Sequence, residues 1–387
     1  MKKFSCILFF SLFLGIFLVG CSGGSSTGSG EDVQTITFYS VGGGDNYYND
    51  ILIPMFEEET GGKYKVEYAR GTPQEIISKI KAQGTNGNID IVATGIDGMP
   101  LGVEEGVWEE LFPEYEEELN YNNLTDSAKA YIEAYDNYGV AMNGESGGPI
   151  IVYNEDTVSD PPTTFEELTA WIEENPKKFS YAPLSVSGPA RGFFFGIAQM
   201  MGEDFQSGAD LTKTWEYLET IGEDIDFYPS KSSDVFNLLY DGTIDIAPHM
   251  PFWYAYDKAQ GQVPDNIEAV RLEGTKQIID AQFYVMVKDL PEERKEAALE
   301  FIEFAMSAEA QAQQYQVGRV PANKEATSDM ILPDYQDSYQ TYLDILMPEF
   351  QQDGDAYVPE DDWILFPNTD VLNGYYTEWE DRIQSQK

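Results

Sequence analysis

Cysteine and histidine are scarce in this chain of 387 residues. Its two cysteines, Cys6 and Cys21, lie near the N-terminus, and His249 is its one histidine. The chain beyond Cys21 therefore has no thiol for a disulfide, a thiolate metal site or a cysteine nucleophile. A lone histidine is more often hydrogen-bonded within a structure than a catalytic base. We expect no metal site and no cofactor, and we expect packing to stabilise the fold.

Basic residues are also few. The chain has 23 Lys and Arg against 68 Asp and Glu, which gives a formal net charge of -45. Such a charge repels phosphate backbones, so we expect no nucleic acid partner. Two explanations of the acidity stay open. Either the acidic residues steer a cationic ligand towards the protein, although salt screens this attraction beyond about 10 Å, or they form a solvated coat suited to a salty habitat.

Two sequence patterns typical of enzymes are missing as well. No His-Glu-x-x-His or phosphate-loop pattern occurs. Adjacent acids such as Asp361 and Asp362 are expected by chance in a chain with 68 carboxylates. We therefore expect a protein that is not an enzyme. A secreted carbohydrate-active hydrolase is the alternative, because it would use paired carboxylates and aromatic platforms.

The N-terminus combines two lysines, an apolar run and a cysteine. The lysines precede the apolar residues 4–19, and Gly20 stands directly before Cys21. This pattern resembles a bacterial lipoprotein signal with its lipobox. The resemblance implies cleavage of residues 1–20, a thioether-linked lipid on Cys21, and a flexible Gly/Ser-rich tether over residues 21–33. The protein would then lie outside the cytoplasm, anchored by lipid to the cell membrane.

An uncleaved transmembrane anchor is the alternative interpretation of the same segment. The apolar run is shorter than the ~20 residues that a membrane-spanning helix needs. Both interpretations place the rest of the chain outside. Cleavage would remove two lysines and no acid, so the net charge would change from -45 to -47.

Strands and helices are expected to alternate in the first part of the chain. The pattern predicts three strands separated by two amphipathic helices, with Thr72 as the cap of the second helix and Pro73 in its first position. The strands are residues 35–39, 64–68 and 89–93, and the helices are residues 49–60 and 73–83. Two β-α-β units in succession favour a parallel sheet with helices on both faces.

Loops at the carboxyl ends of such strands are where ligands bind in open α/β sheets. The loop after the first predicted strand contains Gly43 and Asp45, and the loop after the third contains Thr94 and Asp97. Glycine lets a ligand approach the backbone, and N–H groups at a helix start hold polar or anionic groups. These four residues are therefore candidate ligand contacts.

A second series of α/β elements follows. We expect a helix that starts after Thr163 or Thr164, with Glu166 or Glu167 completing a capping box and an end near residues 175–176. The later segments alternate between the two-residue period of strands and the 3.6-residue period of helices. Strands are predicted over 179–182 and 243–247, with a long extended segment over 279–287. Helices are predicted from Pro189 or Arg191 to 201, over 233–240, from Glu292 or Glu293 to about 307, and over 308–316. The C-terminal residues 328–387 are acidic and aromatic, and we expect helices there that pack across both halves.

Four passages in this order resemble the extracellular solute-binding proteins of ABC importers. After the lipobox, the resemblance covers nearly the whole chain. The passages are Phe56-Glu-Glu-Glu-Thr-Gly with the strand at 64–68, Asn88-Ile-Asp-Ile-Val-Ala-Thr, Pro161-Pro-Thr-Thr-Phe-Glu-Glu-Leu, and Ala297-Ala-Leu-Glu-Phe-Ile-Glu-Phe with Ser307-Ala-Glu-Ala-Gln and Gly318-Arg-Val-Pro. Within that superfamily the chain resembles a branch related to thiamine, polyamine and iron(III) binders.

The resemblance implies a two-lobed α/β fold of the periplasmic-binding-protein type II, with a ligand cleft between the lobes. Lobe 1 would be residues 34–146 with the returning segment 284–325, and lobe 2 would be residues 147–283 with parts of 326–387. The implied protein is a monomer that captures a small solute by hinge closure and delivers it to the permease and ATPase subunits of the importer. A lipoprotein that senses a ligand for a receptor is an alternative with the same fold.

Aromatic and charged residues near the expected cleft are the remaining candidate ligand contacts. Trp253 and Tyr254 follow a predicted strand end and can stack on a ring or face a cation. Tyr39 and Tyr284 are candidate walls, and Arg191 at a helix start can hold an anionic group. Acids such as Asp45 and Asp97 can neutralise a cation. The expected solute is therefore a cation such as a polyamine or thiamine, or a sugar, and a phosphorylated or carboxylated solute stays possible because of Arg191.

Overall fold

The structure, a computed structural model, describes residues 33–41, 44–84 and 87–387, without the side chains of Glu145 and Ser146. The expected signal segment, the expected lipidation site Cys21 and the candidate loop residue Gly43 lie outside the described residues. In the part of the chain that the structure covers, no helix is long and apolar enough to cross a membrane.

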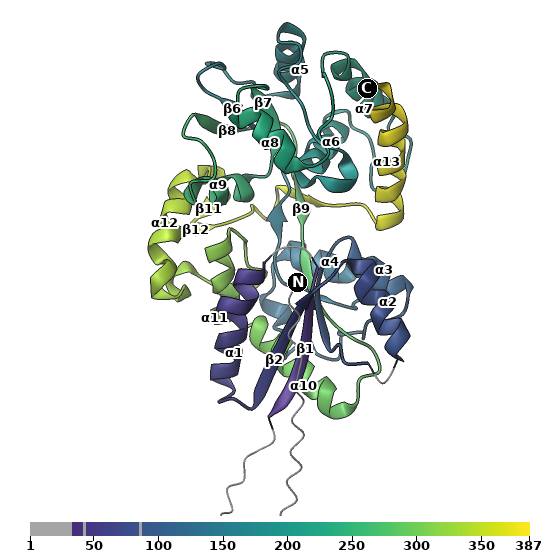
Figure 1. Cartoon of the computed structure of the whole chain (residues 1–387), viewed down its shortest axis with the longest axis vertical. Coiled ribbons are helices and arrows are strands. Elements are labelled where there is room, and N and C mark those ends of the chain that lie inside the picture. The colour runs from purple at the N-terminus through teal and green to yellow at the C-terminus, as the bar shows by residue number, and fades with distance from the viewer. Residues whose placement is uncertain (1–32, 42–43, 85–86) are drawn as a thin grey trace, which may run out of the picture. The chain divides into compact units, whose positions relative to one another are not determined.

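Five strands form a mixed sheet built largely from the N-terminal third of the chain (Figure 1). Strand β1 runs parallel to β2 and β3, as the β-α-β pattern predicts, and β10 lies antiparallel to β3 and β4. The order is β2 (Tyr64–Arg70), β1 (Gln34–Ser40), β3 (Ile91–Gly95), β10 (Gln282–Met286) and β4 (Val140–Ala141). The carboxyl ends of β1 and β3 therefore meet at one edge, next to the start of β10.

Helices cover both faces of this sheet because successive strand residues point to opposite sides. On β10, Phe283 packs edge-on against Tyr131 of α4, whereas Tyr284 contacts Phe301 of α10. The helices are α1 (Ile53–Glu59), which follows a π-helical turn at Tyr47–Leu52, α2 (Pro73–Gln83), α3 (Gly98–Glu104), α4 (Asp126–Ala134) and α10 (Glu292–Ala305). The predicted start of α2 is confirmed, since the Thr72 hydroxyl accepts a hydrogen bond from Glu75 N–H.

A second, antiparallel sheet has β6 at its centre between β7 and β8. Its core strand reads Ile-Ile-Val and is buried on both faces, which matches coverage by helices. The strands are β6 (Ile150–Asn154), β7 (Ile246–His249) and β8 (Ile267–Arg271), and the helices of this part are α5 (Phe165–Glu174), α6 (Gly188–Met200), α7 (Thr212–Gly222), α8 (Ser232–Tyr240) and α9 (Pro251–Ala259). Thr164 caps α5 by accepting from Glu167 N–H, as predicted.

A three-stranded sheet connects the two larger sheets. Its central strand β9 (Gln277–Asp280) pairs with β5 (Glu145–Ser146) and β13 (Trp363–Leu365). The extended segment predicted over residues 279–287 is present, but it belongs to two different sheets. The chain leaves β9 at Asp280 and enters β10 at Gln282, so the single residue Ala281 separates strands of two different sheets.

The C-terminal residues pack over much of the molecule. Helix α12 (Gln336–Ile345) lies against α9 and against the 3-10 turn at Gln313–Val317 that follows α11 (Ala308–Ala312). Helix α13 (Thr369–Arg382) buries Trp379, whose ring meets Tyr181 and Tyr228. A short hairpin of β11 (Gln351–Gln352) and β12 (Asp355–Ala356) lies between them. The expectation of helices is confirmed, whereas β13 was not expected.

Two predicted strands differ from the structure. Residues 179–182 form a single bridge between Phe179 and Ile246, because Ser180 donates its hydroxyl hydrogen bond to Phe227 O and Tyr181 packs against α13. The strand predicted at 243–247 begins only at Ile246, since the Asp241 carboxylate accepts from Thr243 N–H and holds a turn there. Local side-chain bonds thus compete with strand pairing at both places.

Candidate functional site

A cavity of about 200 Å³ lies where the two large sheets and the connecting sheet come together. It combines the loops that follow β1 and β3, the break between β9 and β10, and the first turn of α6. The lining residues are Val41, Gly95, Ile96, Asp97, Asn143, Arg191, Asp280, Ala281 and Gln282. Both halves of the molecule therefore contribute to one polar site, at the carboxyl ends of strands where ligands are expected.

Arg191 reaches the cavity because α6 begins directly beside the connecting strands. Ser187 caps the helix by accepting from Ala190 N–H. A Cβ on Gly192 would lie 2.1 Å from Gly147 O, so only glycine lets the helix approach the connection between β5 and β6 this closely. The Arg191 guanidinium donates to Leu184 O at 3.2 Å, and its buried Nε has no hydrogen-bond partner among the described residues.

The charged groups of the cavity influence one another. Burial acts to lower the pKa of Arg191, but Tyr376, Asp280 and Asp97 outweigh it and the net direction is upward. Burial raises the pKa of Asp280, although the Arg191 charge opposes this shift. The guanidinium therefore keeps its charge at neutral pH. The site combines one cation with two carboxyl groups that face it from other elements.

Neutral polar groups complete the rim. Asn143 is buried, accepts from Gln282 N–H at 2.9 Å and donates towards Gln314. These bonds fix the break between β9 and β10 against the segment after β4. The Thr94 hydroxyl, just before the lining residue Gly95, is buried and has no hydrogen-bond partner among the described residues. An unpartnered buried hydroxyl is costly unless a ligand or water satisfies it.

Among the candidate residues, the structure brings Asp97 and Arg191 together at the cavity. Thr94 lies next to the lining residue Gly95. Asp45 lies apart from these, since its carboxylate accepts from the Tyr68 hydroxyl at 2.7 Å and pairs with Arg70 at 2.6 Å. These bonds hold Asp45 against the end of β2 and leave its charge compensated.

The candidate aromatic residues do not line the cavity in the described part of the chain. The Tyr39 hydroxyl bonds to Lys79, whose ammonium lies over the same ring. Tyr284 is fully buried in the first sheet. Tyr254 is buried and donates to Ile267 O at 2.9 Å, and Trp253 packs edge-on against His249. Each of these aromatic residues is held by protein contacts, and their role in ligand binding stays a prediction.

Several polar residues at the site were missed by the sequence analysis. Asp280, Asn143 and Gln282 line the cavity, and Tyr376 lies near enough to affect the pKa of Arg191. Asp280 carried a usable signal, because it is the one charged residue in the otherwise uncharged run 277–287. Tyr376 carried none, since its approach to Arg191 depends on how α13 packs.

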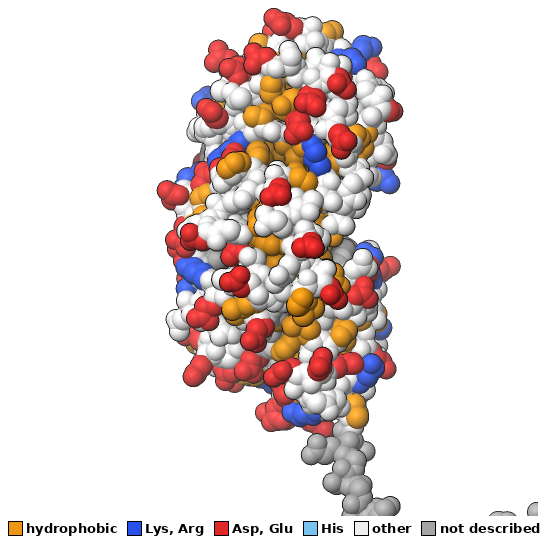
Figure 2. Space-filling model, turned by 90° about the vertical axis from the view of Figure 1, so that its left-hand side faces the viewer, with side chains coloured by type: hydrophobic (Ala, Val, Ile, Leu, Met, Phe, Trp, Pro, Cys, Tyr) orange, Lys and Arg blue, Asp and Glu red, His pale blue; other side chains and the backbone are white. Residues whose placement is uncertain are grey.

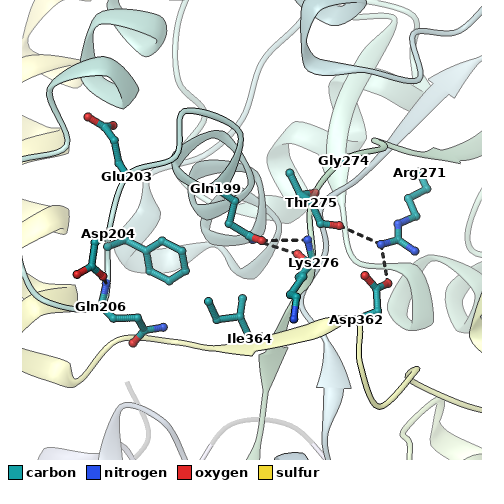
Figure 3. A pocket seen from close by; sticks show the side chains of 11 residues that line it. Gln199, Glu203, Asp204, Gln206, Arg271, Gly274, Thr275, Lys276, Asp362 and Ile364 are labelled. Carbon is teal, nitrogen blue, oxygen red and sulfur yellow. Dashed lines mark hydrogen bonds and ion pairs between the residues drawn. The ribbon is translucent and has the colours of Figure 1, made fainter.

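A second and larger hollow of about 560 Å³ lies over the turn between β8 and β9 (Figure 3). Its polar groups are largely bonded to one another. Gln199 bonds to the backbone of Lys276 in both directions, and Arg271 pairs with Asp362 at 2.6 Å (Figure 3). These contacts hold the β8–β9 turn against the segment that leads into β13, so we assign this hollow a structural role.

The acidity is spread over the surface. Figure 2 shows red carboxylate side chains scattered over the face in view, with few blue ones between them. No group of three or more His, Cys, Asp or Glu side chains in the described ranges is arranged to hold a metal ion.

Comparison with known proteins identifies the family. The family model described as bacterial extracellular solute-binding protein matches residues 52–341. No curated protein matches the sequence. Among solved structures, an ABC transporter protein from Clostridium perfringens ATCC 13124 is similar with a TM-score of 0.68 and 20% identity, covering 90% of this chain and 99% of that one.

Two further structures share the fold. The spermidine/putrescine ABC transporter substrate-binding protein PotD from Streptococcus pneumoniae has a TM-score of 0.66 and 17% identity, covering 91% of this chain and 99% of that one. The Trichodesmium protein IdiA (FutA), in complex with iron and citrate, has a TM-score of 0.62 and 16% identity, covering 90% and 99%. The chain belongs to the bacterial extracellular solute-binding proteins and has their two-lobed α/β fold.

Proposed function

We propose that this protein is the extracytoplasmic solute-binding component of an ABC importer. It captures a small polar solute between its two lobes and delivers it to a permease coupled to an ATPase. The supporting observation is the cavity that joins Asp97 of the β3 loop, Asp280 of the connecting sheet and Arg191 of α6. The protein binds its solute without transforming it.

Hinge closure is the proposed means of capture. The lobes are residues 34–146 with 284–325, and residues 147–283 with parts of 326–387. The connections pass through Gly147 and Gly148 and through Ala281. In support, Gly147 N–H donates to Ile278 O at 2.6 Å, so rotation occurs around a small hydrogen-bonded sheet. A solute that contacts both lobes favours the closed state, because its differential affinity shifts the population.

A lipid anchor at Cys21 is the second part of the proposal. The basic n-region, the apolar run and the small residue before Cys21 support it. Labelling of growing cells with radioactive palmitate tests it, with a Cys21→Ala variant as control. Incorporation of label into the unchanged protein alone is expected. Equal labelling of both proteins, or of neither, would exclude the anchor.

Solute binding is tested by a thermal-shift screen of the purified protein against polyamines, thiamine, sugars, amino acids and metal ions. A compound that binds only the folded state raises the melting temperature by mass action. We expect a rise with one chemical class and no product on long incubation. Product formation would favour the hydrolase alternative, and the absence of any shift would contradict the proposal.

Delivery to a permease requires a separate test. A permease and an ATPase of the importer are reconstituted in liposomes, and ATP hydrolysis is measured with the solute-free and the solute-loaded protein. We expect stimulation by the loaded form. Solute binding without any stimulation would instead favour a sensor lipoprotein.

A further inference from the structure

We propose that the cavity takes a small dipolar solute, one that carries a carboxylate and an ammonium group. The Arg191 end would hold the carboxylate, and Asp97 would hold the ammonium. This inference rests on the proposed function, which it deepens by assigning a substrate class. It depends on the placement of hydrogen-bond donors and carboxylates around the cavity.

Two buried donors lie at the Arg191 end. The Arg191 Nε–H and the Tyr376 hydroxyl are both buried, and neither has a partner of good hydrogen-bond geometry among the described residues, although the two side chains lie close enough to affect each other's pKa. Burial raises the pKa of Tyr376 to about 12, so the hydroxyl stays protonated at neutral pH. Nε and a terminal nitrogen of a guanidinium form a planar fork that matches the two oxygens of a carboxylate. The missing partner at this end is therefore an acceptor with two oxygens.

The contacts that hold the Arg191 side chain in place do not occupy its Nε. Its Nη1 donates to Leu184 O at 3.2 Å, and the guanidinium also interacts with the Tyr376 hydroxyl. The guanidinium carbon lies 5.9 Å from the centre of the Phe366 ring. This geometry orients the side chain through its outer nitrogen and a ring contact, and it leaves Nε available to a ligand.

The carboxyl groups complement an ammonium. Asp97 is exposed at the start of α3, on the loop after β3, and lines the cavity from the first sheet. No lysine is among the residues that line the cavity in the described part of the chain. With Asp280 beside it, the lining holds two carboxyl groups and one guanidinium, and the charge of Arg319 outside the lining also acts on Asp280. A purely anionic solute would therefore meet repulsion, whereas a solute with a charge of each sign satisfies both ends.

Size and shape restrict the solute further. A volume of about 200 Å³ is below the roughly 300–1,000 Å³ that is usual for ligand pockets. No aromatic ring lines the cavity among the described residues, so a sugar would lack the stacking surface that holds its apolar face. A short amino acid fits these limits. Because Asp97 follows β3 of the first sheet and Arg191 lies on α6 of the other half, the same solute would also link the two lobes.

The test compares amino acids with their singly charged parts. Glycine, β-alanine, γ-aminobutyrate and δ-aminovalerate vary the spacing of the two charges, and each is paired with the matching amine and the matching carboxylate. Spermidine and glucose represent the other classes. Thermal shift and isothermal titration calorimetry on the purified protein measure binding. We expect one amino acid of the series to bind at least about tenfold more tightly than its amine or its carboxylate.

Variants then assign the two ends. Arg191→Gln and Asp97→Asn should each weaken the best amino acid at least about tenfold, and Tyr376→Phe about threefold to tenfold. Arg382→Gln and Asp226→Asn make the same chemical changes at exposed ion pairs away from the cavity, and they should leave the affinity unchanged.

Three other outcomes would contradict the dipolar solute, the assignment of Arg191, or the proposed function. If spermidine, glucose or a simple amine binds most tightly, the dipolar solute is excluded while the receptor function stands. If an amino acid binds equally well to the Arg191→Gln variant, the assignment of Arg191 is wrong. If no compound of any class shifts the melting temperature, both the inference and the proposed function fall.

Discussion

Tyr256 of α9 lies directly against Gly318, the residue that ends the 3-10 turn Gln313–Val317. A Cβ added to Gly318 would be 2.7 Å from the Cβ of Tyr256. Gly318 also has a φ of +71°, in the left-handed region that favours glycine. Backbone conformation and close packing therefore both require glycine here, where two distant parts of the chain meet.

Gly318→Ala should therefore destabilise the protein through strain and a clash. Gly261→Ala is a matched control, because Gly261 has a φ of +68° and open space around it. Both variants incur the left-handed strain, and only Gly318→Ala adds overpacking. We expect it to lower the free energy of unfolding by about 1–3 kcal/mol more than the control, as measured by urea denaturation. Equal losses would show that the contact with Tyr256 is easily relieved.

Asp90→Asn should lower stability strongly. Asp90 is buried, accepts from Arg294 Nε at 2.7 Å and from Thr37 N–H at 2.7 Å, and so ties α10 to the start of β3. Removing its charge leaves the partly buried Arg294 uncompensated, which we expect to cost about 3 kcal/mol. The measurement is the midpoint and slope of urea unfolding.

Asp226→Asn provides the control for Asp90→Asn. Asp226 forms an ion pair with Lys177 in which both side chains are largely exposed, so its loss should change the unfolding midpoint little. Similar effects of the two substitutions would contradict the role assigned to burial.

Stability should fall in weak acid because of His249. Burial lowers the pKa of His249 from 6.5 to about 3. The unfolded state then binds more protons than the folded state below pH 6.5, so stability is lost as the pH falls from 6.5 towards 3. The loss approaches about 1.4 kcal/mol per pH unit at most.

His249→Asn isolates this effect. An asparagine side-chain oxygen can replace Nδ1, which accepts from Met250 N–H at 2.8 Å. Carboxyl groups titrate equally in both proteins, so the difference between their unfolding free energies reports His249. We expect the unfolding free energy of the unchanged protein to fall relative to that of His249→Asn between about pH 6.5 and pH 5, because the histidine takes up a proton in the unfolded state before it does so in the folded state. A difference that does not vary with pH would rule out the depressed pKa.

Two tryptophans should respond differently to truncation. Trp379 is fully buried and donates from its ring nitrogen to the Tyr181 hydroxyl at 3.3 Å, so Trp379→Ala should cost about 3–5 kcal/mol. Trp253 is 36% exposed, and Trp253→Ala should cost less. Titration of the Trp253→Ala variant with the solute also tests the predicted role of this ring. Unchanged affinity would remove Trp253 from the set of ligand contacts.

Local sequence signals predicted most of the elements. The three parallel strands, α2 with its Thr72 cap and α5 with its Thr164 cap follow from hydrophobic periodicity and capping residues, which act over a few residues. The break at Ala281 did not follow from such signals. Residues on both sides of it read as extended, and only pairing with partners far away in the sequence places them in different sheets.

The candidate site also combines features that the sequence predicts with features that depend on tertiary packing. The sequence by itself determined that polar loops follow β1 and β3, that Arg191 stands at a helix start, and that the chain resembles solute-binding proteins. Only the tertiary structure decided that Asp280 and Tyr376 lie beside Arg191, and that Tyr254 and Tyr284 are buried in the cores. Alternation and capping are properties of neighbouring residues, but convergence on a cavity depends on how sheets and helices pack. That packing joins residues almost two hundred positions apart, and no local pattern records it.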